Sequence, residues 1–162
     1  MAPQICRLKM KKILFTFIFI IFLVAFFNIN TSTQQCVNYK CRSIDLPLFL
    51  KGLDFFDRHF NYARLVKEIT KDCRDEEEKI LKILHWTYTN IRRNPAGLPI
   101  VDDHVWHIIV RGYGATDQLQ DVFTTLCNYA QLNAFFTDVS NRNNNSKRCL
   151  GFVKLKRGWS VF

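Results

Sequence analysis

The hydrophobic residues of the chain form one unbroken run near the N-terminus and several periodic segments after it. The run extends from Ile13 to Phe27, with Thr16 as its single polar residue. It follows a group of basic residues: Arg7, Lys9, Lys11 and Lys12. A run of this kind has no polar face for solvent, so we expect a membrane-targeting helix rather than a helix of a soluble core. Its length of about 15 residues is below the ~20 of a typical membrane span, which leaves both a signal-peptide core and a short signal anchor open.

The residues after the run favour an anchor that is not cleaved. No small-residue cleavage pattern follows Phe27, where residues 28–32 read Asn-Ile-Asn-Thr-Ser. The basic flank then keeps the N-terminus in the cytoplasm and puts the rest of the chain outside. We expect a signal anchor or signal peptide over residues 1–30, a polar tether over 31–53 and one domain over 54–162. The expected location is the membrane with an extracytoplasmic domain, or secretion if the segment is cleaved.

Helical spacing of apolar residues predicts the first part of the domain. Residues 54–70 carry apolar side chains at helical intervals, which indicates one or two short amphipathic helices. A clearer helix is predicted from about Asp75 to Ile91, with Asp72 as the candidate N-cap. Acidic residues crowd its first turn and Arg92 and Arg93 follow its end, as the helix dipole favours.

A loop and a buried helix are expected next. Residues 94–99 contain two prolines and a glycine, which end the helix and begin a loop of about 15 residues. From Asp117 to Ala130 an apolar pattern predicts a central buried helix, with Gln118, Gln120 and Thr124 on its other faces. Three strands follow, at residues 134–136, 150–155 and 159–162.

If the chain is exported, its six cysteines can form disulfides, because oxidising compartments permit them. Cys36 and Cys41 are close enough in sequence to close a local disulfide loop. Cys6 falls on the cytoplasmic side. The sequence leaves open the pairing of the remaining three: Cys73, Cys127 and Cys149. No C-x-x-C spacing occurs, so a structural zinc site is not expected.

The net charge of +9 owes four of its units to the basic flank of the apolar run. A second basic group lies near the C-terminus: Arg142, Lys147, Arg148, Lys154, Lys156 and Arg157. These residues are suited to an anionic wall polymer, to phospholipid headgroups, or to solvent alone. An exported chain has little access to nucleic acid, which we do not expect as a partner.

Four motifs occur in a fixed order along the chain. They are Glu78–Trp86, Thr89–Arg92, Arg111–Gln118 and Lys154–Phe162. The first two resemble the helix before the active site of the transglutaminase-like superfamily, the third its glycine-x-cysteine turn, and the last its strand, hairpin turn and tryptophan strand. The resemblance covers about residues 63–162. It implies a papain-like α+β fold, with a central helix packed on an antiparallel sheet and the domain incomplete at its C-terminus.

The resemblance implies a cysteine–histidine–aspartate site, in which a helix dipole and an imidazolium stabilise a thiolate. The family's nucleophile falls on Thr116, and its histidine falls at Arg148 or Cys149. Neither residue is a general base of the needed kind, since arginine stays protonated. The aspartate would come directly after the last strand, and the sequence stops at Phe162. We therefore expect a non-catalytic relative or a piece of a longer chain.

The loop before the glycine turn holds candidate metal ligands: Asp102, Asp103, His104 and His107. Their spacing is a weak metal pattern, so no metal and no cofactor are expected. The resemblance implies that this loop lines a cleft beside Gly114. The candidate binding residues are Trp106, His107, Tyr113, Asp117 and Gln118. An aromatic wall of Trp106, Tyr113 and Trp159 would suit a peptide or glycan, with core packing as the simpler role for Trp159.

Two further nucleophiles are less suited to catalysis. Cys127 lies about three turns after Thr116 on the apolar face of the central helix, where a buried structural cysteine is expected. Thr116 would need a strong base or a free N-terminal amine, and with Asp117 it suits a helix cap better. The sequence predicts a membrane-anchored, extracytoplasmic, non-catalytic domain that binds a peptide or cell-surface polymer. The alternatives are an active acyl-transfer or amide-cleaving enzyme and a structural partner in envelope assembly.

Overall fold

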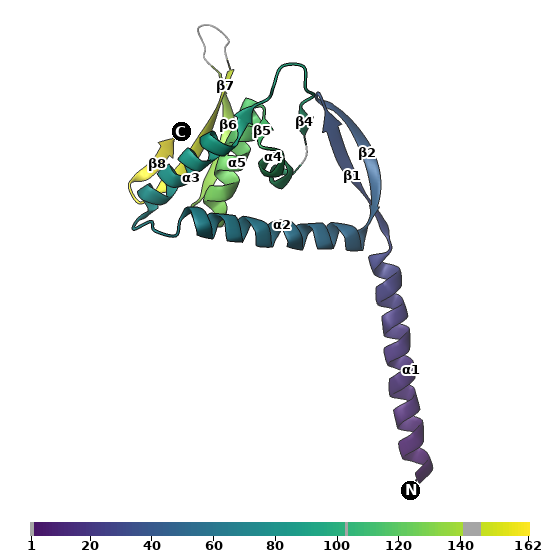
Figure 1. Cartoon of the computed structure of the whole chain (residues 1–162). Helices are drawn as coiled ribbons and strands as arrows, with labels where there is room; N and C mark the ends of the chain where they lie inside the picture. Colours follow the sequence, from purple (N-terminus) through teal and green to yellow (C-terminus); the bar gives the residue numbers. More distant parts are fainter. Residues whose placement is uncertain (1, 103, 141–146) are drawn as a thin grey trace. The chain divides into compact units, whose positions relative to one another are not determined.

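The computed structural model describes residues 2–102, 104–140 and 147–162, with side chains described from residue 12 onward. Figure 1 shows the order of the helices and strands. The chain divides into two compact units, one of residues 1–34 and 43–56, the other of residues 35–42 and 57–162. The first unit contains the N-terminal helix, and the second contains the core and the candidate site.

The first unit consists mainly of helix α1 (Ala2–Phe27) and the first turns of helix α2 (Leu48–Ile69). Backbone and side-chain hydrogen bonds tie the start of α2 to the residues after α1: the N–H of Leu48 donates to the carbonyl of Ile29 at 3.0 Å, and Lys51 Nζ donates to the carbonyl of Ser32 at 2.7 Å. The start of α2 is therefore attached to the segment that directly follows α1.

Helix α1 forms where the apolar run predicts a helix. Of the helices in the described part of the chain, however, none is both long enough and apolar enough to cross a membrane. The N-terminal membrane helix that the sequence led us to expect is thus not found.

Residues expected to form a polar tether form a β-hairpin instead. Strands β1 (Asn30–Val37) and β2 (Lys40–Pro47) belong to one sheet with the order β2-β1-β4, where β4 is Val101–Asp102. The hairpin was missed because its partner β4 lies far along the chain, and a polar sequence carries little strand signal without that pairing. The disulfide between Cys36 and Cys41 spans the turn of the hairpin, which confirms the predicted local pair.

The second unit has its core around helix α5 (Thr116–Tyr129), as the apolar pattern predicts. Helices α3 (Glu76–Asn90) and α4 (Val105–Arg111) pack against α5, and so does an antiparallel sheet with the order β6-β7-β8 (Figure 1). The strands of this sheet are β6 (Ala134–Ser140), β7 (Lys147–Leu155) and β8 (Gly158–Val161). The fully buried side chains include Ile80, Ile83, Ile108, Val122, Phe123, Leu126 and Val153.

Two details around α5 differ from the sequence analysis. The loop expected before the glycine turn contains α4, because Ile108 and Ile109 reach the core and make this short segment amphipathic. The polar residues on the other faces of α5 are buried together with its apolar ones: Gln118, Gln120 and Thr124. Helix α5 is therefore enclosed by protein on these faces too.

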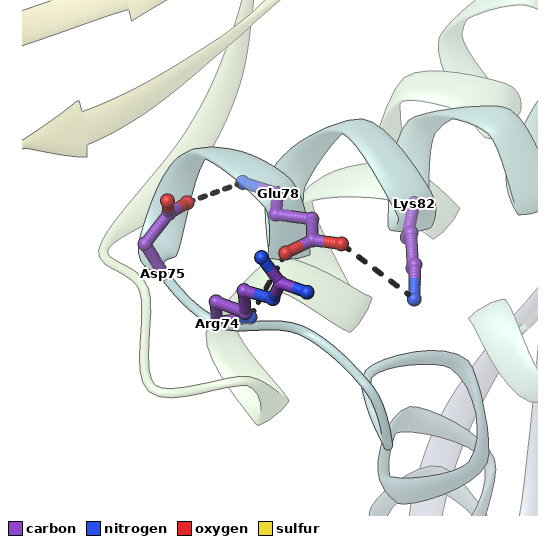
Figure 2. Close-up of polar contacts among 4 residues, drawn as sticks. All are labelled: Arg74, Asp75, Glu78 and Lys82. Atoms are coloured by element: carbon purple, nitrogen blue, oxygen red, sulfur yellow. Dashed lines mark hydrogen bonds and ion pairs between the residues drawn. The ribbon is translucent and has the colours of Figure 1, made fainter.

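Helix α3 begins with a reciprocal cap, which Figure 2 shows. Asp75 Oδ1 accepts a hydrogen bond from the N–H of Glu78 at 2.8 Å, and Glu78 Oε2 accepts one from the N–H of Arg74 at 2.9 Å. Glu78 Oε1 also lies 3.9 Å from Lys82 Nζ. The prediction of Asp72 as the cap was wrong, because Asp75 has the extended backbone that directly precedes the helix.

The cap can be tested by substitution. Asp75→Ala should lower the free energy of unfolding by about 1 kcal/mol, since the N–H of Glu78 loses its acceptor. Asp72→Ala is the matched control and should change that free energy by less than about 0.5 kcal/mol. Urea denaturation followed by circular dichroism measures both values. Equal losses in the two variants would contradict the assignment of the cap.

Candidate functional site

The candidate site is built around the turn from Arg111 to Thr116, where α4 ends and α5 begins. Gly112 terminates α4 with a φ of 72°, a left-handed conformation that favours glycine, and its N–H donates to the carbonyl of Ile108 at 2.9 Å. Strand β5 (Tyr113–Gly114) then pairs in parallel with β3 (Arg92–Arg93). These contacts set the direction in which the chain enters α5.

The side chain of Gln118 holds the start of α5 in place. Its Oε1 accepts a hydrogen bond from the N–H of Ala115 at 3.0 Å, and its Nε2 donates to the carbonyl of Val101 at 2.6 Å. Gly114 leaves room for this side chain, because a Cβ there would lie 3.0 Å from Gln118 Oε1. Gln118, a predicted binding residue, is only 6% exposed and uses its amide inside the protein.

The side chain of Arg111 also binds the backbone around the start of α5. Its Nη2 donates to the carbonyl of Val101 at 3.1 Å, and its Nε donates to the carbonyl of Tyr113 at 3.0 Å. The guanidinium lies over the ring of Tyr113, 5.5 Å from the centroid, as in a cation–π contact. Tyr113, another predicted binding residue, is half-buried at this corner.

Thr116, at the predicted nucleophile position, is the first residue of α5 and is exposed. Ala115 occupies the N-cap position, so the prediction of Thr116 as the cap was wrong. The N–H groups and the dipole of this first turn favour a negative group. A threonine hydroxyl is far less acidic than a thiol and stays neutral here.

Of the two predicted histidine positions, strand register brings only Cys149 toward α5. Cys149 pairs with Asp138 and Arg148 with Val139, and successive side chains of a strand point to opposite faces. Cys149 shares its face with Val153, which is fully buried in the core. Arg148 is exposed and points to the outer face of the sheet.

Thr116 and Cys149 lie on facing surfaces of α5 and β7. Thr116 is one turn before Gln120 on the same helix face, and a Cβ at Gly151 would lie 2.6 Å from Gln120 Oε1. Cys149 is two residues before Gly151 on the same strand face. Gln120 is 4% exposed and its Nε2 donates to the hydroxyl of Tyr88 at 3.2 Å. Sequence periodicity did not reveal this buried amide, since glutamine is mostly found at the surface.

The charges around Cys149 disfavour a thiolate. Burial, together with the negative charges of Asp138, Asp117 and Asp121, raises the pKa of Cys149 to about 11. Burial also raises the pKa of Asp121. A catalytic thiolate needs the opposite surroundings, with a cationic partner beside the helix start. The thiol of Cys149 therefore stays protonated near neutral pH.

The predicted binding residues Trp106 and His107 lie on α4. Trp106 is half-buried and packs against Tyr62, with ring centroids 5.3 Å apart, so it contributes to the core. His107 is exposed, with its ring 6.2 Å from that of His104. Asp103, a candidate metal ligand, lies outside the described residues. Among the residues that the structure does describe, no group of three or more His, Cys, Asp or Glu could hold a metal ion.

Cys127 is fully buried in α5, and burial raises the pKa of its thiol to about 12. This confirms the prediction of a buried structural cysteine. Cys73, Cys127 and Cys149 are free thiols. The side chain of Cys6, and Arg142 of the basic group, lie outside the part of the chain that the structure describes.

The outer face of the β6-β7-β8 sheet carries an aromatic strip, formed by Phe135, Phe152 and Trp159. The rings of Phe135 and Phe152 stack with centroids 5.1 Å apart, and Trp159 meets Phe135 edge-on, also at 5.1 Å. Trp159 is 52% exposed, so the prediction that it packs in the core was wrong. Lys154 is the register partner of Trp159, and Arg148 lies on the same face. The aromatic strip therefore has basic side chains beside it.

No protein-family model matches the chain, and no curated protein matches it significantly. Two solved structures have a similar fold. One, from Parabacteroides distasonis, is described as a "putative protease"; its TM-score is 0.52, with 10% identity over 64% of this chain and 23% of that one. The other, from Cytophaga hutchinsonii, is described as a "putative cysteine protease"; its TM-score is 0.53, with 16% identity over 64% of this chain and 36% of that one.

These likenesses support the fold class that the motifs imply. The chain has a mixed α+β fold whose two three-stranded sheets have antiparallel pairings, and it is similar to the folds of these two structures. It spans less than half the length of either structure. At such low identities the likeness concerns the fold alone, so a function has to be argued from the site.

The protonated state of Cys149 can be tested by alkylation. With a pKa of about 11, its reaction with iodoacetamide near neutral pH should be about a hundredfold slower than that of a peptide thiol, whose pKa is about 8.5. Asp138→Asn removes one negative neighbour and should lower this pKa and speed the reaction. Mass spectrometry of the labelled protein over a pH series measures the rate at each cysteine.

Cys127 serves as the internal control for this measurement. Its slow reaction should not change in the Asp138→Asn variant, because only burial raises its pKa. A rate at Cys149 equal to that of a peptide thiol in the folded protein would show that the negative surroundings do not hold the thiol protonated.

Proposed function

We propose that the chain is a non-catalytic member of the transglutaminase-like superfamily that binds a peptide or a cell-surface polymer outside the cytoplasm. The observation that carries the proposal is the pair of side chains at the centre of the site. Thr116 stands exposed at the start of α5, and the protonated thiol of Cys149 lies on β7 within reach of the charges of Asp117 and Asp121 in the first turns of that helix. The four sequence motifs and the fold shared with two solved structures support the family.

The chemistry of the site argues against thiol-based acyl transfer. That reaction needs a thiolate, a base that takes up and returns a proton, and a group that orients the base. Here the helix start carries a hydroxyl, and the strand carries a thiol with a raised pKa. An oxyanion formed beside them would meet the carboxylates of Asp117 and Asp121, which oppose negative charge. The glycine turn and the helix start form the frame of such a site without its reactive groups.

The proposed location rests on the N-terminus and on the disulfide. A basic flank followed by an apolar run is typical of an export segment. The disulfide between Cys36 and Cys41 is suited to an oxidising compartment. We therefore propose a domain outside the cytoplasm, held at the membrane by its N-terminal segment or secreted after cleavage of that segment. Nucleic acid is not a partner in this proposal.

The aromatic strip is the surface that fits a polymeric ligand. Exposed rings on a rigid sheet offer flat apolar area for sugar rings or peptide side chains. Lys154 and Arg148 on the same face add positive charge. The ligand that matches both features is an acidic polysaccharide or an acidic peptide.

Substitution of Thr116 tests whether a catalytic site persists. Thr116→Cys should have no measurable acyl-transfer or amidase activity, because a thiol alone lacks a general base. Thr116→Ala should leave ligand binding within about twofold of wild type. Ammonia release from glutamine peptides and labelling with an electrophilic probe measure the activity. Activity gained in Thr116→Cys, and absent from Thr116→Ala, would show that the rest of the site is functional and would favour an enzyme.

Substitution of Trp159 tests the ligand surface. Trp159→Ala should weaken binding of polygalacturonate by about fivefold, since one aromatic contact contributes about 1 kcal/mol. Calorimetric titration measures the affinity, with neutral dextran as the comparison ligand. Leu81→Ala removes a side chain of similar exposure, 59%, from α3 and should have no effect. Equal affinities in the two variants would exclude the aromatic strip as the site.

An active protease or acyltransferase is the second candidate, because the two structures of similar fold are described as proteases. It would require a general base, and the predicted histidine positions carry Arg148 and Cys149. One cysteine that reacts far faster than the others with an electrophilic probe would favour this candidate over a binding protein.

A further inference from the structure

The first turns of α2 carry a stripe of exposed apolar side chains. Phe49, Leu53 and Phe56 are 38%, 63% and 58% exposed. Their spacing puts them on one face of the helix, one turn apart. Gly52 belongs to the same face, and a Cβ there would meet no atom within 4 Å. We call these four residues the α2 stripe.

A stripe of this kind indicates a partner. Single exposed apolar residues are common on proteins, but a contiguous row of large ones marks an interaction surface. A surface helix of a globular protein turns its apolar stripe toward the core. The α2 stripe instead stays exposed within its unit, and the exposed fraction is higher at Leu53 and Phe56 than at Phe49, where the row begins.

The surroundings of the stripe point to lipid as that partner. The backbone of Leu48 and the side chain of Lys51 are bonded to Ile29 and Ser32, so the stripe begins close to the end of α1. The apolar side chains of α1 between Ile13 and Phe27 are also exposed, apart from a partly covered Leu23. One compact unit therefore presents two neighbouring apolar helical surfaces.

The charge of the unit agrees with a lipid surface. The sequence of residues 1–34 and 43–56 contains more basic than acidic side chains. The basic ones are Arg7, Lys9, Lys11, Lys12 and Lys51, and the acidic ones are Asp45 and Asp54. The four basic residues of α1 lie at its N-terminal end, where they can attract anionic headgroups, and Lys51 is the basic residue within the first turns of α2.

We propose that the α2 stripe lies in the headgroup layer of a lipid bilayer, with the helix parallel to the surface and the rings of Phe49 and Phe56 buried among the acyl chains. Interfacial helices bury their apolar face about 5–10 Å deep, which side chains of this length can reach. The beginning of α2 is then a second membrane contact beside α1. This inference rests on the proposed membrane association and adds a site to it.

A tryptophan introduced into the stripe reports on its surroundings in the full chain. The Leu53→Trp variant is studied with vesicles of phosphatidylcholine and a minority of phosphatidylglycerol, whose brominated acyl chains quench tryptophans that enter the lipid. The emission added by the new tryptophan should fall by about twofold or more when vesicles are present. Val110→Trp is the control. Val110 is 70% exposed, but it lies on α4 rather than on the stripe, one turn after the polar side chain of His107. A tryptophan at position 110 should therefore stay out of the lipid, and its emission should not change when vesicles are added.

Gly52 offers a test in the opposite direction. Gly52→Leu adds an apolar side chain to the stripe in open space and should raise the affinity for these vesicles by about tenfold. Gly52→Asp should lower it. Co-sedimentation with the vesicles measures both affinities, and circular dichroism checks that both variants keep their helices.

Three outcomes would overturn the proposal. If the Leu53→Trp variant binds vesicles while its introduced tryptophan stays unquenched, only the N-terminal segment meets the membrane, and the proposed location survives. Protein that does not bind vesicles at all would remove both the stripe and the membrane association. A dimer in sedimentation, with a blue shift of the introduced tryptophan on concentration without lipid, would show that a second copy covers the stripe.

Discussion

The arrangement of the site depends on the buried amide of Gln118. One end of this amide fixes the backbone at Ala115, where α5 begins, and the other end fixes the carbonyl of Val101 on β4. Through β4 the contact extends to Cys36 and Val37 of β1. A buried amide with an unpaired end costs about 1–3 kcal/mol, so both bonds have to form together. Glycine at position 114 suits this arrangement, because a Cβ there would lie only 3.0 Å from Gln118 Oε1 and the side chain would have to shift.

The backbone at the start of α5 favours an anion, whereas the charged side chains around the site oppose one. The start of α5 is suited to an anion, as in enzymes that hold a thiolate there. The carboxylates of Asp117, Asp121 and Asp138 surround the facing strand position, and their charges help to keep Cys149 protonated. The surfaces that remain open to partners lie elsewhere, on the aromatic strip of the sheet and on the first turns of α2. The first combines flat rings with basic side chains, and the second is an apolar row beside an apolar helix, so they suit a polymer and a lipid surface respectively.

Much of the fold could be predicted from local patterns, because those patterns report on burial along one element. The apolar period of α5, the strands of the β6-β7-β8 sheet and the buried state of Cys127 were all predicted correctly. The Cys36–Cys41 disulfide followed from their short separation. Features set by distant partners were missed: the hairpin that pairs with β4, and the exposure of Trp159 on the outer face of its sheet. The site residues divide in the same way, since strand register rather than sequence spacing separates Cys149 from Arg148.

By itself the sequence determined the residue types at the site and the order of its elements. Thr116 follows a glycine turn, Arg148 and Cys149 stand where the resemblance led us to expect histidine, and these identities limit the chemistry whatever the packing. Only the tertiary structure decided which of them meet, because facing surfaces and burial come from segments far apart in the chain. It turned Cys149 toward α5, buried the amides of Gln118 and Gln120, and left Phe135 and Trp159 of the aromatic strip exposed. A pKa follows from such surroundings, and so the raised pKa of the Cys149 thiol is a property of the fold rather than of the residue.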